Sequence, residues 1–145
     1  MVDRDLVASK LGELAEHLAR VRTRRTVTAE DLRRDRDALD LVSFNLMLAV
    51  QACADVASHV IADEGWPPAA SLGAGFERLK DHGVITGPVC EALGRAVGLR
   101  NVIAHGYAGV RPEIVHAAAT TGLADLEGFA REVATWARGH EGPRS

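Results

Sequence analysis

Apolar residues recur at steps of three and four positions along most of this 145-residue chain, and this spacing limits its fold more than any other feature of the sequence. A step of this size places the apolar side chains on one face of an α-helix. One stripe runs from Val7 to Val21, and a longer one runs from Leu39 to Val60. The stripes predict five helices: one that ends near Thr23, one over residues 29–62, a short one after Ser71, one from Pro88 to about Ala104, and one that begins at Pro112.

Capping residues and helix breakers separate these segments. Thr28 and Ser71 stand where a helix needs an N-cap. The sequence Gly-Trp-Pro-Pro at positions 65–68 ends the long helix, and no strand pattern extends beyond a few residues. We therefore predict an all-α fold, an antiparallel four-helix bundle with an additional short helix. We expect a single domain over residues 1–138 and a flexible tail over 139–145.

Composition narrows the class of protein. Hydrophobic residues make up 47% of the chain and aromatic residues only 4%, which suits closely packed helices better than a sheet. The formal charge of −3 gives no global signal for nucleic acid, so any RNA contact requires a local patch. Cys53 and Cys90 fall in apolar helical patterns, and we expect both to be small core residues in a reducing compartment. With no secretory leader and no apolar run near the ~20 residues that span a bilayer, we expect a soluble cytoplasmic protein.

Polar, chemically capable residues crowd into one short stretch around the end of the fourth predicted helix. Arg100, Asn101, His105 and Tyr107 lie within eight positions, and Tyr107 is the only tyrosine of the chain. If the helix runs to about Ala104, Asn101 and His105 are one turn apart on one face. His105 then lies at the helix C-terminus, where the helix dipole favours a positive charge.

These residue types suit the cleavage of RNA without a metal. A histidine can move protons near neutral pH. An arginine can bind a phosphate and stabilise the charge that develops when the neighbouring 2′-hydroxyl attacks it, and Asn101 could orient either group. The structural alternative is that Arg100 and His105 only cap carbonyls near a helix end, and the residue types alone favour that alternative.

The spacing of Arg100, His105 and Tyr107 resembles the R-x4-H-x-Y signature of the HEPN superfamily. The run Leu-Arg-Asn-Val-Ile-Ala-His-Gly-Tyr over 99–107 is similar to that of the HepT-like toxins of type VII HepT–MntA toxin–antitoxin systems. The resemblance extends over residues 35–130. It includes Asp-Val-Ala-Ser-His at 55–59, Gly-Trp-Pro-Pro at 65–68, Phe-Glu-Arg-Leu at 76–79 and Gly-Val-Ile at 83–85.

The resemblance implies a homodimeric, metal-independent RNA endonuclease that acts as the toxin of a toxin–antitoxin pair. Arg100 and His105 would be its catalytic residues, with Asn101 and Asp55 in support, and it would need no cofactor of its own. The implied partner is an MntA-like minimal nucleotidyltransferase antitoxin, which uses ATP to transfer AMP to Tyr107. The added phosphates would place negative charge where the RNA phosphate binds, and this would silence the nuclease.

Two other functions stay open at this point. In one, the chain is a non-catalytic subunit whose R-x4-H site binds a nucleotide or serves as the docking face for the nucleotidyltransferase. In the other, the chain is a purely structural helical dimer. The sequence indicates neither the RNA target nor the cleavage site.

Seven arginines cluster around the first predicted turn, and they could guide RNA or contact the antitoxin. Acidic residues are interleaved with them, which favours a solvated surface that is partly paired with itself. The pair Glu113-x-x-His116 resembles half of a di-iron motif, but no second copy is present, so we expect no metal site. The arginines are Arg20, Arg22, Arg24, Arg25, Arg33, Arg34 and Arg36.

Overall fold

The computed structural model describes residues 3–106 and 110–140, and within these ranges the chain forms seven helices and no strand. Most of the predicted tail, residues 141–145, lies outside the described residues. The long helices are α1 (Arg4–Arg24), α3 (Arg36–Glu64), α5 (Gly87–His105) and α7 (Thr121–Gly139). The short helices are α2 (Ala29–Arg34), α4 (Leu72–Asp81) and α6 (Pro112–Ala119).

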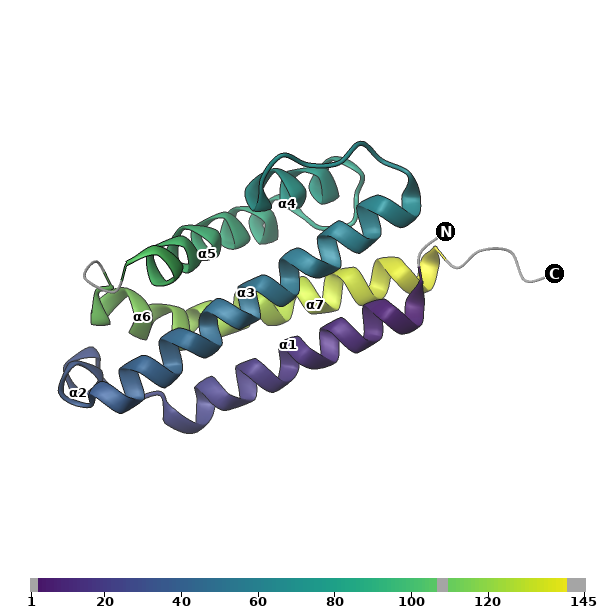
Figure 1. The fold of residues 1–145 in the computed structure, drawn as a ribbon. Helices are drawn as coiled ribbons and strands as arrows, with labels where there is room; N and C mark the ends of the chain where they lie inside the picture. Colours follow the sequence, from purple (N-terminus) through teal and green to yellow (C-terminus); the bar gives the residue numbers. More distant parts are fainter. Residues whose placement is uncertain (1–2, 107–109, 141–145) are drawn as a thin grey trace.

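The long helices form an antiparallel bundle, as predicted (Figure 1). Consecutive long helices pack against each other in the order α1, α3, α5, α7, and α7 closes the bundle against α1. Helix α4 packs on α3 and α5 at one end of the bundle, while α2 and α6 pack together at the other end. Helix α3 contacts every other helix and is therefore the centre of the fold.

Two of the predicted helices are each divided in the structure. The predicted helix over 29–62 is interrupted at Asp35, whose backbone is extended (φ −112°, ψ 90°) and whose carboxylate accepts a hydrogen bond from the Ala38 amide at 3.0 Å. The last predicted helix is interrupted at Thr120, whose hydroxyl donates to the His116 carbonyl at 2.9 Å. In both places a polar side chain bonds to the backbone, which competes with a continuous helix. The apolar spacing runs across both breaks, so the spacing alone predicted unbroken helices.

The predicted helix ends are confirmed where a side chain or a glycine defines them. The Thr28 hydroxyl accepts a hydrogen bond from the Asp31 amide, and the Ser71 hydroxyl accepts one from the Ala74 amide, both at 3.1 Å. Gly65 follows the last residue of α3 with a φ of 73°, a left-handed conformation that favours glycine. Thr28 thus marks the start of α2, Gly65 marks the end of α3, and Ser71 marks the start of α4.

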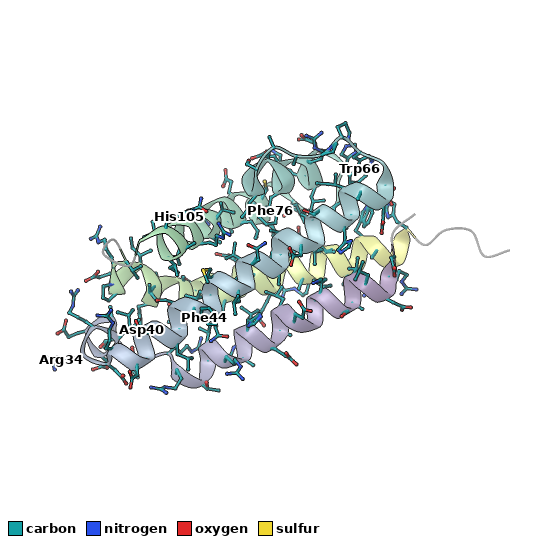
Figure 2. The ribbon with its side chains drawn as sticks, viewed as in Figure 1. Arg34, Asp40, Phe44, Trp66, Phe76 and His105 are labelled. Carbon is teal, nitrogen blue, oxygen red and sulfur yellow. The ribbon has the colours of Figure 1, made fainter. Side chains whose placement is uncertain are left out.

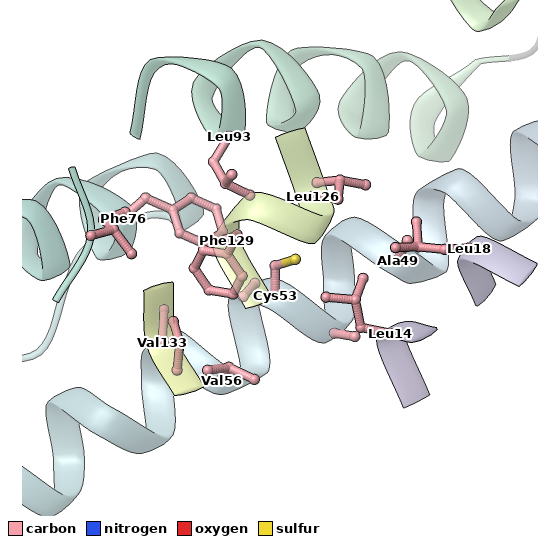
Figure 3. Packing of buried hydrophobic residues seen from close by; sticks show 14 of the residues in the cluster. Leu14, Leu18, Ala49, Cys53, Val56, Phe76, Leu93, Leu126, Phe129 and Val133 are labelled. Carbon is pink, nitrogen blue, oxygen red and sulfur yellow. The ribbon is translucent and has the colours of Figure 1, made fainter. Parts of the chain in front are cut away.

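A continuous apolar core joins the helices (Figure 3). Phe76 of α4 and Phe129 of α7 are fully buried and pack edge to face, with ring centroids 5.7 Å apart. Cys53 on α3 and Cys90 on α5 are free and buried, as expected of core residues. Burial raises the pKa of the Cys53 thiol far above its ordinary value, because the apolar core disfavours a thiolate.

Among the described residues, α3 is the one helix that is long and apolar enough to cross a membrane by length and composition, with a mean hydropathy of 1.5 in its most apolar window. However, 61% of that window is buried inside the protein. Such burial is typical of the central helix of a bundle, which is apolar on nearly all sides.

Candidate functional site

Two side-chain amides hold the guanidinium of Arg100, which extends from α5 to α3. Its Nη2 donates a hydrogen bond to Oε1 of Gln51 on α3, and its Nη1 donates one to Oδ1 of Asn101, both at 3.1 Å. Its Nε is buried and has no hydrogen-bond partner among the described residues. No ion pair joins Arg100 to a carboxylate in the part of the chain that the structure describes. The two groups that accept hydrogen bonds from this cation, the amides of Gln51 and Asn101, are therefore both uncharged.

Gln51 also connects Arg100 with Asp55, the predicted supporting residue. Gln51 Nε2 donates to Asp55 Oδ1 at 3.4 Å, and Lys10 Nζ of α1 lies 3.9 Å from Asp55 Oδ2. Asp55 thus reaches Arg100 through Gln51. Gln51 was missed as a site residue, although it is the only glutamine of the chain and lies four positions before Asp55 in an apolar stretch.

His105 is the last residue of α5, and its side chain is exposed (Figure 2). It follows Asn101 by one helical turn, so the two residues share a face, as expected. Arg100 lies five positions before His105, which places them about 7.5 Å apart along the helix axis and about 140° apart around it. Asn101 bonds to Arg100 and shares the helical face of His105. Tyr107 lies outside the described residues.

A cavity of about 220 Å³ opens beside Arg100, between α3, α5, α6 and α7. Its charged lining residues are Arg95, Arg100 and Asp125. Ile114 of α6 lines it as well, and 46% of this residue is exposed. Arg100 thus lies between a polar contact on α3 and a mostly apolar hollow. The apolar lining includes Met47, Val50, Leu99, Ile103, Ala118 and Leu126.

The arginine cluster around the first turn is largely paired within the protein. Arg33 forms ion pairs with Glu30 and Glu113, and the second of these joins α2 to α6. Arg25 donates to the Ala119 carbonyl at 3.0 Å. This surface is therefore mainly paired with itself, which is the interpretation that the interleaved acidic residues favoured. The other pairs are Arg22–Glu127, Arg24–Asp35, Arg34–Glu30 and Arg36–Asp40.

Glu113 and His116, which resemble half of a di-iron motif, have other partners in the structure. Glu113 forms the ion pair with Arg33. His116 Nε2 lies 3.1 Å from the carbonyl oxygens of both Thr26 and Val27. Glu113 thus joins α6 to α2, and His116 joins α6 to the turn between α1 and α2.

The sequence matches a known family over most of its length. The family described as Ribonuclease HepT-like matches residues 14–133. The mRNA nuclease HepT of Shewanella oneidensis is 26% identical over 125 residues, which cover 86% of this chain and 93% of that protein. The match therefore includes every described residue of the candidate site except Lys10.

Solved structures share the fold. The tri-AMPylated HEPN toxin of Shewanella oneidensis, in complex with the MNT antitoxin, has a TM-score of 0.83 at 25% identity, covering 93% of this chain and 99% of that one. A toxin–antitoxin structure with AMP-PNP has a TM-score of 0.84 at 24% identity, covering 90% and 98%. The cytosolic protein of unknown function YutE of Bacillus subtilis has a TM-score of 0.83 at 16% identity, covering 99% and 96%. The same helical fold is thus common to proteins of very different sequence.

Proposed function

Because this chain belongs to the HepT-like ribonuclease family, we propose that it is an RNA endonuclease and the toxin of a toxin–antitoxin pair. The guanidinium of Arg100, held by two neutral amide oxygens, is the observation that supports this most. An arginine has five N–H donors, and the amides of Gln51 and Asn101 take one each. The Nε–H is buried, so two Nη–H donors and the full positive charge are left for an RNA phosphate.

In the proposed reaction, the 2′-hydroxyl of one nucleotide attacks the phosphorus of the adjoining phosphodiester. His105 accepts the proton of that hydroxyl, and the departing 5′-oxygen receives a proton from the histidine or from water. Arg100 stabilises the charge on the phosphorus oxygens, and Asn101 orients the arginine. The products are a 2′,3′-cyclic phosphate and a 5′-hydroxyl, a chemistry that requires neither a metal nor a cofactor in the toxin.

Substitution of the two candidate catalytic residues tests this proposal. Arg100→Ala and His105→Ala should each abolish cleavage of RNA by the purified protein and growth inhibition in cells, while circular dichroism stays unchanged. Arg34→Ala is the matched control, because Arg34 is exposed and its one ion pair among the described residues is with Glu30. Cleavage that survives both substitutions would refute the proposed site. A protein that cuts no RNA but still binds the transferase would instead be a docking subunit.

We also propose that an MntA-like minimal nucleotidyltransferase neutralises this toxin by transferring AMP from ATP to Tyr107. Support comes from the Shewanella oneidensis HEPN toxin, which is tri-AMPylated in its complex with the MNT antitoxin. Tyr107 lies two positions after His105, so adenylate phosphates there would repel an RNA phosphate. Intact mass should rise in adenylate steps with the partner and ATP, and Tyr107→Phe should gain none. An unchanged mass with an active partner would reject the mechanism.

We also propose that the protein is a homodimer and that it acts in the cytoplasm. Val102 of α5 is 40% exposed and lies between Arg100 and His105 in the sequence. Ile114 of α6 is 46% exposed and lines the cavity beside Arg100. A second copy that covers these side chains would bring two R-x4-H sites close together, since a twofold interface uses the same patch of both copies.

A further inference from the structure

Gln51 joins Arg100 to Asp55, although the R-x4-H motif gives it no role. We propose that Gln51 is a positioning residue, which holds the Arg100 guanidinium in place for the RNA phosphate and leaves its charge intact. The inference rests on the proposed function of Arg100. Gln51 lies 49 positions before Arg100, and the packing of α3 against α5 brings the two side chains together.

The partners of Gln51 determine which way its amide faces. Its oxygen accepts from the Arg100 cation at 3.1 Å, and its nitrogen donates to the Asp55 carboxylate at 3.4 Å. If the amide were turned round, its NH2 group would face the guanidinium and its oxygen would face the carboxylate, so both bonds would be lost. Asp55 therefore orients the amide, and the amide orients Arg100. Lys10 balances part of the Asp55 charge.

A neutral acceptor at this position has a chemical advantage over a carboxylate. A carboxylate in contact with Arg100 would pair with it and compete with the phosphate for the same donors. The amides of Gln51 and Asn101 each accept one hydrogen bond and add no charge. They also restrict a side chain that is otherwise rich in rotamers, so less conformational entropy is lost when RNA binds. Arg100 is thus held in place before the substrate arrives.

Gln51→Leu removes both hydrogen bonds while nearly preserving the size of the side chain. We expect kcat for RNA cleavage to fall about tenfold or more, in line with the loss of a hydrogen bond to a charged group. KM should change less, because the charge of Arg100 stays close to the RNA. The matched control is Ser58→Leu, an exposed position two helical turns further along α3, which should cleave at the wild-type rate.

Gln51→Glu separates the role of orientation from the role of charge. The glutamate still accepts a hydrogen bond from Arg100 but adds a negative charge next to Asp55 and the guanidinium. We expect KM to rise and the salt dependence of RNA binding to weaken, because one phosphate contact is partly neutralised. The kcat should fall less than in Gln51→Leu, since Arg100 remains held.

The guanidinium signals in 15N NMR spectra give a readout that does not depend on cleavage. The Nη signals of Arg100, assigned by their absence in Arg100→Lys, should be separate in the wild type and in Gln51→Glu, and averaged by rotation in Gln51→Leu. Wild-type kcat and unchanged Arg100 signals in Gln51→Leu would overturn the positioning role. If Arg100→Ala cleaves RNA like the wild type, the proposed function fails instead, and the NMR comparison still decides whether Gln51 holds the guanidinium.

Discussion

Asn101 lies between the two candidate catalytic residues in the sequence of α5. It accepts a hydrogen bond from Arg100 at 3.1 Å and lies one turn before His105 on α5. This contact is local and exposed, whereas the contact of Arg100 with Gln51 crosses between two helices and is partly buried. The two amides should therefore differ in what they contribute to the site.

We expect Asn101→Ala to slow RNA cleavage about threefold to tenfold, which is less than the loss for Gln51→Leu. The reason is that an exposed hydrogen bond between neighbouring residues contributes less than a partly buried one. Single-turnover rates on end-labelled RNA at saturating protein measure the effect. Equal losses for the two variants would show that Asn101 holds Arg100 as firmly as Gln51 does.

We expect the buried thiol of Cys53 to make the stability of the protein sensitive to alkaline pH. Its folded-state pKa is raised by burial, so the folded protein keeps the thiol proton where the unfolded chain loses it. The stabilisation is fully present below the pKa of the unfolded thiol, about 8.5, and is lost as pH rises above it. The free energy of unfolding should fall by up to about 1.4 kcal/mol per pH unit from this group.

Urea unfolding of the wild type and Cys53→Ala between pH 8 and pH 10 measures this loss. The variant should be less stable at pH 8, because it leaves a small void in the core, but its stability should decline less steeply with pH. The difference between the two proteins then shrinks as pH rises. Parallel curves over the whole range would show that the Cys53 thiol contributes nothing to the pH dependence.

At the scale of the helix, glycine has opposite effects at two positions. Gly65 follows α3 with a φ of 73°, and Gly12 lies exposed in α1, where an added Cβ would have no atom within 4 Å apart from its own stretch of helix backbone. Alanine at position 65 must adopt a left-handed backbone, which costs about 1–2 kcal/mol. Alanine at position 12 removes the entropic cost of glycine in a helix, worth about 0.5–1 kcal/mol.

We therefore expect Gly65→Ala to destabilise the protein and Gly12→Ala to stabilise it, by these amounts. Denaturant midpoints and slopes measured side by side give both free energies. Because the two substitutions add the same methyl group, Gly12→Ala controls for side-chain volume and hydrophobicity. A loss of stability in both variants would mean that the surroundings of Gly12 on α1 are more crowded than the structure shows.

The helices themselves were predictable from the sequence, and their interruptions were not. Apolar spacing located the long helices, and the caps Thr28 and Ser71 located the starts of the short helices α2 and α4, because both signals are local. The breaks at Asp35 and Thr120 depend on single side chains that bond to the backbone, while the apolar stripe continues across them. A hydrophobic pattern contains no information about such competition.

The candidate site was predictable only where the motif is local. Arg100, Asn101 and His105 could be grouped because they lie on two turns of one helix. The contact of Arg100 with Gln51 depends on the register between α3 and α5, which no spacing along the chain specifies. For the same reason the sequence placed Asp55 in support of the site but gave no sign that Gln51 stands between it and Arg100.

At the scale of the whole molecule, the described residues include four exposed large apolar side chains, which are Val27, Phe44, Val102 and Ile114. Val102 and Ile114 lie near Arg100 on α5 and α6, and they are 40% and 46% exposed. Val27 is 90% exposed and lies on the turn between α1 and α2, and it does not line the cavity beside Arg100. If the protein acts as the proposed homodimer, Val102 and Ile114 should be covered by the second copy and Val27 should stay in solvent.

Val102→Glu and Ile114→Glu should each weaken self-association at least about tenfold, whereas Val27→Glu should leave it unchanged. In a twofold dimer each glutamate occurs twice, so burying the interface would desolvate two like charges. Sedimentation velocity over a range of concentrations measures the association, and circular dichroism confirms that the monomers remain folded. If all three variants associate like the wild type, the interface lies elsewhere. Val102 stands between Arg100 and His105, so Val102→Glu also alters the helix that carries the candidate catalytic residues. Ile114→Glu leaves α5 unaltered, and in this variant cleavage and the dimer fraction should fall together.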